Sequence, residues 1–292
     1  MAGGPNNKQY LVHDGVLLSV GHPLFGADNR AFRYGDVVFE TLRVHRGRIL
    51  FWERHYQRLL SGMAVLQMAV ASLPPAQALY SSIIDLVVKN RIFYDARIRL
   101  TVYRKGVGLY TPERMQVSWL IEATDLQQTG YGFADKGLRI GIFSGLPKLA
   151  GPLSPFKTGA SQSYVVAGIH AREQGWDDAL VVNGQGLVIE SFNSSLFWVK
   201  DEVVYTPLVS SGCIDGVLHR ELQQLAGQEG IKWVESPGAR EAELLDADEI
   251  FLGNVIAGIR WVAAYKNRRY LARISKRLHR ALKERLEADR SS

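Results

Sequence analysis

Apolar and polar positions divide the first 120 residues into strands and two helices. Segments that alternate apolar and polar residues predict β-strands at 8–20, 36–52, 96–104 and 117–124, with a turn at 45–48. Segments with apolar residues at helical spacing predict helices at 53–68 and 76–90, separated by Pro74 and Pro75. Strands beside two helices favour an α+β fold class, and we expect a small N-terminal domain over residues 1–122.

The second half of the chain has shorter apolar runs. They predict strands at 138–143, 178–183, 187–191, 195–200, 203–206 and 249–253, and helices at about 160–174 and 215–229. Residues 123–134 are polar and contain glycine, which suits an interdomain connection. We therefore expect a larger, mostly-strand domain with helices over residues 135–292.

Positive charge is concentrated at the C-terminal end. The net charge is +6, yet residues 266–290 contain ten Lys or Arg and three acids, a balance of +7 that leaves −1 for the rest. Apolar residues recur there at helical spacing: Leu271, Ile274, Leu278, Leu282 and Leu286. This pattern predicts a docked amphipathic helix with a basic outer face. A basic module that binds nucleic acid or an acidic partner is the alternative, although no aromatic residues interleave the charges.

The composition narrows the class of protein. Apolar residues make up 47% and charged residues 22%, as in globular proteins, and no apolar run is long enough for a membrane span. The first ten residues lack the pattern of a secretory signal. Cys213 is the single cysteine, and the seven histidines are scattered without a metal-binding spacing. We expect a cytoplasmic protein that holds no metal and has no contact with a membrane.

Lys157 stands out because of its surroundings. It lies in the stretch SPFKTGASQ (154–162), with no charged residue within eight positions on either side. The flanking glycines and prolines favour a rigid, irregular approach. A lysine in a tightly packed apolar setting loses hydration, which makes the neutral amine needed for Schiff-base chemistry accessible near pH 7. A structural lysine and a catalytic one both fit the stretch by itself.

Four further features carry chemical groups that suit an anionic ligand or a buried charge. Arg58 lies on the first predicted helix, and Glu190 ends a strand that reads as buried, where a carboxylate needs a partner. Residues 210–220 lead into a helix whose N-terminal N–H groups favour an anion. A turn at Asn254, within 248–262, offers a second set of backbone donors.

Taken in order, these segments resemble the class IV aminotransferase family, whose enzymes use pyridoxal phosphate. The matching motifs are FRYGDVVFETLRV, HYQRL, KTG, DALVVNGQGLVIES, LFWV, YTP, GVLHR and ADEIFL, and the resemblance as a whole extends from about residue 10 to residue 262. The resemblance implies the two-domain D-amino-acid-aminotransferase-like fold, with the cofactor between the domains, a small-molecule amine substrate and a homodimer. Nucleic acid is not an expected partner on this interpretation.

The resemblance also implies roles for individual residues. Lys157 would hold the cofactor covalently and then move a proton at the substrate carbon. Glu190 would keep the ring nitrogen protonated, and Arg58 would pair with the phosphate. The N–H groups of Val217, Leu218, Asn254 and Val255 would complete the phosphate site. Thr41 would bind substrate or relay a proton, and the residues near the substrate would be Phe39, Arg43, Arg97, Arg99 and Arg104.

Departures from the family pattern separate two activities. The KTGASQS stretch lacks the tyrosine that many branched-chain transaminases place a few residues after the lysine. LGNVIAG has an Asn followed by apolar residues where transaminases have a Ser/Thr-rich turn, and in this respect it is similar to aminodeoxychorismate lyases, as is LFWVKDEVVYTP. The resemblance therefore favours a lyase that forms p-aminobenzoate and pyruvate for folate synthesis. A transaminase acting on branched-chain or D-amino acids is the alternative.

Overall fold

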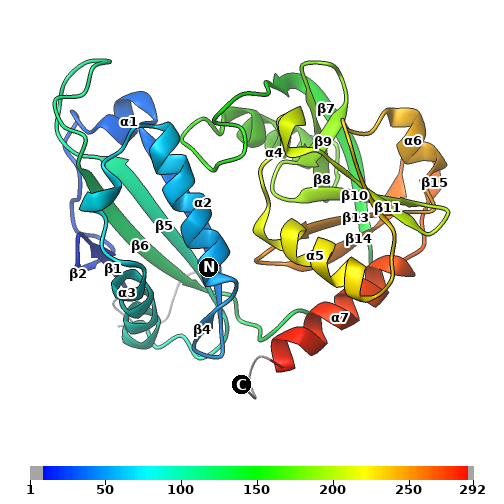
Figure 1. Ribbon diagram of the computed structural model, residues 1–292, viewed down its shortest axis with the longest axis horizontal. Helices are drawn as coiled ribbons and strands as arrows, with labels where there is room; N and C mark the ends of the chain where they lie inside the picture. Colours follow the sequence, from blue (N-terminus) through cyan, green and yellow to red (C-terminus); the bar gives the residue numbers. More distant parts are fainter. Residues whose placement is uncertain (1–8, 289–292) are drawn as a thin grey trace. The chain divides into compact units, whose positions relative to one another are not determined.

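The computed structural model describes residues 9–288, which form two compact units (Figure 1). The first unit ends at Gly130 and also includes Phe156–Ala160, and the second comprises the remaining described residues from Tyr131 onward. The segment that contains Lys157 therefore groups with the N-terminal part of the chain. The prediction that the first ten residues lack a secretory-signal pattern falls mostly on residues 1–8, which lie outside the described range. Arg290 of the basic C-terminal segment also lies outside it.

The first unit is built on a six-stranded antiparallel sheet with the order β2-β1-β6-β5-β3-β4. Its strands are β1 (Tyr10–His13), β2 (Val16–Ser19), β3 (Val37–His45), β4 (Arg48–Ile49), β5 (Ala96–Arg104) and β6 (Val117–Asp125). Its helices are α1 (Arg30–Tyr34), α2 (Trp52–Val65), the short η1 (Val70–Ser72) and α3 (Ala76–Lys89). The predicted helices and the strand at 96–104 are confirmed, whereas α1 was not predicted.

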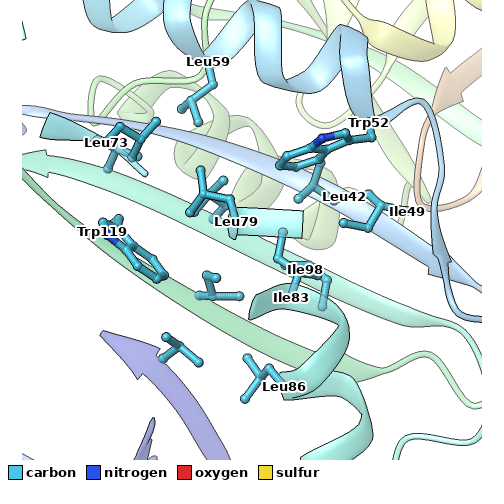
Figure 2. Close-up of a cluster of buried hydrophobic side chains, with 14 of the residues drawn as sticks. Leu42, Ile49, Trp52, Leu59, Leu73, Leu79, Ile83, Leu86, Ile98 and Trp119 are labelled. Atoms are coloured by element: carbon cyan, nitrogen blue, oxygen red, sulfur yellow. The ribbon is translucent and has the colours of Figure 1, made fainter. Parts of the chain in front are cut away.

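One face of this sheet packs against α2 and α3 to form the core of the unit (Figure 2). Ile98, Leu100 and Val102 of β5 point into this core, while Arg97 and Arg99, which alternate with them along the strand, do not. The strict alternation in the sequence therefore gave the correct faces. Consequently the opposite face of β3 and β5 bears the polar side chains on which a site can be built.

The second unit contains a nine-stranded sheet that curls until strands β9 and β10 pair, so that six of its strands close into a ring. Its strands are β7 (Leu138–Lys148), β8 (Asp178–Asn183), β9 (Val188–Ser191), β10 (Ser195–Lys200), β11 (Val203–Pro207), β12 (Trp233–Ser236), β13 (Glu249–Asn254), β14 (Gly258–Tyr265) and β15 (Arg268–Arg269). All residues of β8 and β9 are buried. The apolar runs at 179–182 and 188–189 fit strands that are covered on both faces, and the polar residues at the strand ends are buried with them.

Helices cover the sheet of the second unit. They are α4 (Gln162–Glu173), the short η2 (Val209–Ser211), α5 (Val217–Gln228), α6 (Glu241–Asp246) and α7 (Ile274–Ala288). Helix α7 confirms the predicted amphipathic C-terminal helix, since Leu278 and Leu282 are fully buried. Leu271, however, precedes the helix and is 68% exposed, so its place in the apolar stripe was predicted wrongly. None of the helices within 9–288 is both long and apolar enough to cross a bilayer.

Candidate active site

Lys157 is held against strand β3 by backbone hydrogen bonds. The Phe39 N–H donates to the Lys157 carbonyl over 2.8 Å, and the Gly159 N–H donates to the Val37 carbonyl over 3.2 Å. Gly159 permits this approach, because a Cβ there would lie 2.6 Å from the Gly35 carbonyl oxygen. The KTG motif thus extends the sheet by a short strand-like segment, which fixes the lysine backbone.

The environment of the Lys157 amine disfavours its charged form. Part of the side chain is accessible to solvent, although protein atoms densely surround the ammonium. Burial, with a contribution from the Arg58 guanidinium, lowers the pKa of Lys157 from 10.5 to about 8, despite the opposing Glu40 carboxylate. At neutral pH a useful fraction of the amine is therefore unprotonated, as a nucleophile or a general base requires.

Arg58 is oriented by a carboxylate that the sequence analysis did not single out. Its Nε donates to Glu40 Oε1 over 2.8 Å and its Nη2 donates to Oε2 over 2.6 Å, while His55 Nδ1 lies 2.7 Å from Oε2. Glu40 is 1% exposed, and despite burial the Arg58 charge lowers its pKa to about 2. The spacing of His55 and Arg58, one helical turn apart, was the available signal for a shared partner. The structure shows that Glu40, which also contacts His55, anchors Arg58. A contact between Arg58 and a phosphate stays a prediction.

The polar face of β3 and β5 brings together several residues that the sequence placed near a substrate. Thr41 lies directly opposite Arg99, and Phe39 lies opposite Thr101, so these side chains share one face of the sheet. The Arg99 guanidinium carbon lies 3.6 Å from the centre of the Phe39 ring, and its Nε donates to the Thr101 hydroxyl. Lys157 Nζ lies 5.8 Å from the same ring. This face therefore carries the lysine, a hydroxyl and arginine side chains.

Two other arginines from the predicted set are engaged within the fold. Arg43 is fully buried, and its Nε donates to Asp95 over 2.7 Å. Arg104 is 5% exposed and donates to Asp36 and to the Leu66 carbonyl. Buried charges of this kind need their partners. These contacts argue against a role for Arg43 and Arg104 in binding a substrate carboxylate.

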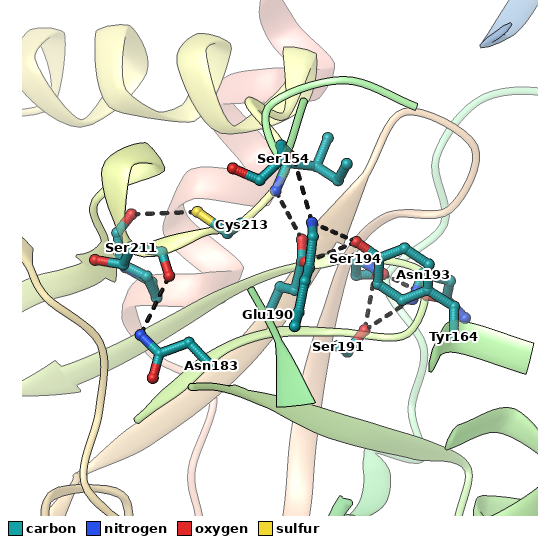
Figure 3. Close-up of polar contacts among 12 residues, drawn as sticks. Ser154, Tyr164, Asn183, Glu190, Ser191, Asn193, Ser194, Ser211 and Cys213 are labelled. Carbon is teal, nitrogen blue, oxygen red and sulfur yellow. Dashed lines mark hydrogen bonds and ion pairs between the residues drawn. The ribbon is translucent and has the colours of Figure 1, made fainter. Parts of the chain in front are cut away.

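Glu190 lies in a polar cluster of the second unit (Figure 3). Its Oε1 accepts from Lys148 Nζ and from the Tyr164 hydroxyl, each over 2.8 Å, and its Oε2 accepts from the Ile214 N–H over 2.9 Å. Glu190 is 3% exposed, so the expectation that a carboxylate here needs partners is confirmed. Sequence reasoning missed Lys148 and Tyr164, because they lie 42 and 26 residues away along the chain.

The predicted phosphate donors lie next to this cluster within the second unit. No side chain caps the N-terminus of α5 at Val217, which follows Gly216. A Cβ at Gly216 would lie 2.5 Å from the hydroxyl of Ser195, and Ser195 pairs with both Glu190 and Gly253. The structure thus places Val217 and Leu218 beside the strands that carry Glu190 and Asn254.

Asn254 closes the turn between β13 and β14. Its Oδ1 accepts from the Ile256 and Ala257 N–H groups over 2.9 and 2.8 Å, and its Nδ2 donates to the Ser194 hydroxyl. The carbonyl of Val255, the next residue, accepts from the Tyr131 hydroxyl over 2.6 Å. An Asn side chain therefore organises a turn that is otherwise lined by apolar residues.

Comparison with known proteins identifies the family of the chain. Residues 37–265 match the family model of class IV aminotransferases. The chain belongs to the class IV aminotransferases. It is 25% identical to the aminodeoxychorismate lyase of Vibrio harveyi, over 79% of this chain and 83% of that protein. It is 28% identical to the branched-chain-amino-acid aminotransferase of Salmonella typhimurium, over 79% of this chain and 76% of that protein.

The fold of this class IV aminotransferase is shared with a solved structure of the branched-chain aminotransferase of Thermoproteus uzoniensis. The TM-score is 0.85, with 23% identity over 94% of this chain and 93% of that one. The expected family and α+β fold are confirmed, and the protein is an enzyme. A purely non-enzymatic binding module, the alternative raised by the basic C-terminal segment, is thereby excluded.

Class IV aminotransferases use pyridoxal phosphate, and the residues present fit this cofactor. Lys157 supplies an amine of lowered pKa, and the uncapped α5 N-terminus supplies donors suited to a phosphate. The Glu190 carboxylate accepts three hydrogen bonds from protein groups, whereas a carboxylate has about four acceptor positions. One position on Oε2 is therefore left for a further donor such as a protonated ring nitrogen.

Proposed function

We propose that this enzyme is an aminodeoxychorismate lyase, which releases p-aminobenzoate and pyruvate and so serves folate synthesis. The observation that carries the proposal is the cationic face beside Lys157. Arg97 and Arg99 lie two residues apart on that face, next to the Thr41 hydroxyl. A substrate with two carboxylates suits two guanidinium groups, whereas the alkyl side chain of a branched-chain amino acid suits an apolar wall.

Each residue then has a defined task. Bound pyridoxal phosphate supplies an electron sink for the pair released at the amine-bearing carbon. The neutral amine of Lys157 takes the proton from that ring carbon. The ring–oxygen bond then breaks, the ring becomes aromatic, and the departing enol takes up a proton to become pyruvate. Thr41, 7% exposed and opposite Arg99, is placed to bind the departing group or relay that proton.

The turn at Asn254 supports the same activity. Its closure by an amide side chain, followed by apolar residues, is similar to the lyases and unlike the Ser/Thr-rich turn of the transaminases. We assign the N–H groups of Asn254, Val255, Val217 and Leu218 in the second unit to the cofactor phosphate. We keep Arg58 of the first unit, whose guanidinium is held by Glu40, as a proposed phosphate partner.

The test is product formation from aminodeoxychorismate with no 2-oxo acid present. We expect release of p-aminobenzoate and pyruvate in equal amounts, abolished in Lys157→Ala and strongly reduced in an Arg97→Gln/Arg99→Gln double variant. Lys200→Met serves as the matched control, because Lys200 pairs with Asp246 on the surface of the second unit. Absence of p-aminobenzoate from folded protein carrying the cofactor would overturn the proposal.

A transaminase acting on branched-chain or D-amino acids is the second candidate. The observation that favours it is the 28% identity to the Salmonella typhimurium branched-chain enzyme, against 25% for the Vibrio harveyi lyase. It predicts turnover only when an amino donor and a 2-oxo acid are both supplied. A screen of D- and L-amino acids with 2-oxo acids distinguishes it from the lyase.

A further inference from the structure

Lys148 places an ammonium directly on the carboxylate that we assign to the cofactor ring. Its Nζ lies 2.8 Å from Glu190 Oε1, and it also donates to the Tyr164 hydroxyl over 2.6 Å and to the Ser154 carbonyl over 3.3 Å. Only 13% of the Lys148 side chain and 4% of the Glu190 side chain are exposed. A buried ion pair is costly to assemble unless its geometry and its additional hydrogen bonds are good. Here both side chains have such bonds.

Tyr164 adds a neutral donor to the same oxygen. Its hydroxyl donates to Glu190 Oε1 over 2.8 Å, while it accepts from Lys148. Burial, together with the adjoining Glu190 carboxylate, raises the pKa of Tyr164 well above its usual range. The phenol therefore keeps its proton and acts as a donor at any working pH. The three side chains form a closed triangle of hydrogen bonds within the second unit.

This triangle fixes which oxygen of Glu190 remains available. Lys148 and Tyr164 together occupy Oε1. Among the residues that the structure describes, Oε2 accepts only the Ile214 N–H, which comes from the segment that leads to α5. Rotation of the carboxylate would break all three contacts. The remaining acceptor position is therefore confined to Oε2 and to one direction.

We propose that Lys148 and Tyr164 are positioning residues that act through Glu190, holding its carboxylate so that Oε2 meets the ring nitrogen of the cofactor. This inference rests on the proposed role of Glu190, and it concerns cofactor binding rather than the choice between lyase and transaminase. It assigns a function to two partly buried side chains that the proposed reaction does not otherwise use.

The experiment is a double-mutant cycle read out as the dissociation constant for pyridoxal phosphate, measured with unloaded protein and no substrate. We expect Lys148→Met to weaken binding by roughly 10- to 100-fold, the range found when partners that orient a ligating side chain are removed. In the Glu190→Gln background the same substitution should change the dissociation constant by less than about 2-fold. Lys148→Arg, which keeps a charged donor, should restore most of the affinity, and Lys200→Met should leave it unchanged.

Tyr164→Phe provides a second cycle, needed because Lys148→Met leaves a buried carboxylate without its cation and can prevent folding. Loss of this hydrogen bond should weaken cofactor binding by about 5-fold in the presence of Glu190, and not in the Glu190→Gln background. Equal weakening in both backgrounds would overturn the inference, since both residues would then act independently of Glu190. So would unchanged affinity in Lys148→Met or Tyr164→Phe. Because no substrate is present, these outcomes are independent of the lyase assay.

Discussion

The lowered pKa of Lys157 gives a quantitative prediction for how the unloaded enzyme captures its cofactor. An ordinary lysine with a pKa near 10.5 is about 0.03% neutral at pH 7. Burial, with the Arg58 charge, brings the pKa of Lys157 to about 8, so that about 10% is neutral at the same pH. If the neutral amine is the reactive form, Lys157 gains roughly 300-fold in reactive population at pH 7.

The assay mixes unloaded protein with pyridoxal phosphate at pH 6 to 10, stops samples with borohydride, and measures the modified peptides by mass. We expect the initial capture rate at Lys157 to rise about tenfold per pH unit up to pH 7.5, and to level off above about pH 8. Lys200 provides an internal comparison, because its hydrogen bond to Asp246 raises its pKa. Its labelling should still be rising at pH 10.

The neighbouring cations provide the control for the physical cause. The Arg99 charge lowers the pKa of Lys157, so Arg99→Gln should move the midpoint to higher pH and slow capture at pH 7. A midpoint near 10.5 in the native protein, shared with surface lysines, would refute the reasoning. It would mean that water reaches the Lys157 ammonium freely.

Three further predictions concern buried titratable groups. Within the described part of the chain, neither carboxyl oxygen of Asp178 has a well-formed hydrogen bond, although Ser191 lies near, and burial raises the pKa of Asp178 from 3.8 to about 7. Unfolding in urea should therefore show that the free energy of unfolding falls by about 4 kcal/mol relative to Asp178→Asn as pH rises from 4 to 8. Burial lowers the pKa of His219 from 6.5 to about 4, so acidification from pH 7 to 4 should lower the free energy of unfolding by roughly 3 kcal/mol in the native protein but not in His219→Phe. Equal losses of stability in the two proteins, measured by thermal unfolding, would contradict this. Glu40→Gln should destabilise the protein by about 3 kcal/mol or more and weaken cofactor binding, because it leaves the Arg58 guanidinium without its carboxylate. A calorimetric scan measures the loss of stability, and a cofactor titration measures the loss of affinity.

The periodicity of apolar residues was sufficient to predict the elements whose structure depends on their own sequence. The alternation in β5 gave the correct inner face, and the helical spacing gave α2, α3 and the buried side of α7. The failures arose where an element is defined by its neighbours. Strand β14 was not predicted, because its position depends on pairing with β13 and β7, which a local pattern does not encode.

The candidate site divides in the same way. The environment of Lys157 could be predicted from its neighbours in the sequence, since a lone lysine among small residues and prolines indicates a desolvated amine. The lowered pKa of Lys157 agrees with that prediction. The need of Glu190 for a partner was also readable, but its partner Lys148 lies 42 residues away, beyond any local pattern. Alternation placed Arg43 on the polar face of β3 and could not show that Asp95 binds it.

The distribution of arginines over β3 and β5 explains why this distinction matters for function. Arg43 lies on the polar face and Arg104 on the core-facing side of β5, and each pairs with a carboxylate, Asp95 and Asp36 respectively, so both fix the sheet. Arg97 lies opposite Arg43 and Arg99 lies opposite Thr41, and the Phe39 ring holds the Arg99 guanidinium in place. A guanidinium steadied by an aromatic face loses less entropy when it binds an anion. The same charges lower the pKa of Lys157, so a single set of cations both prepares the amine and favours a substrate that carries carboxylates.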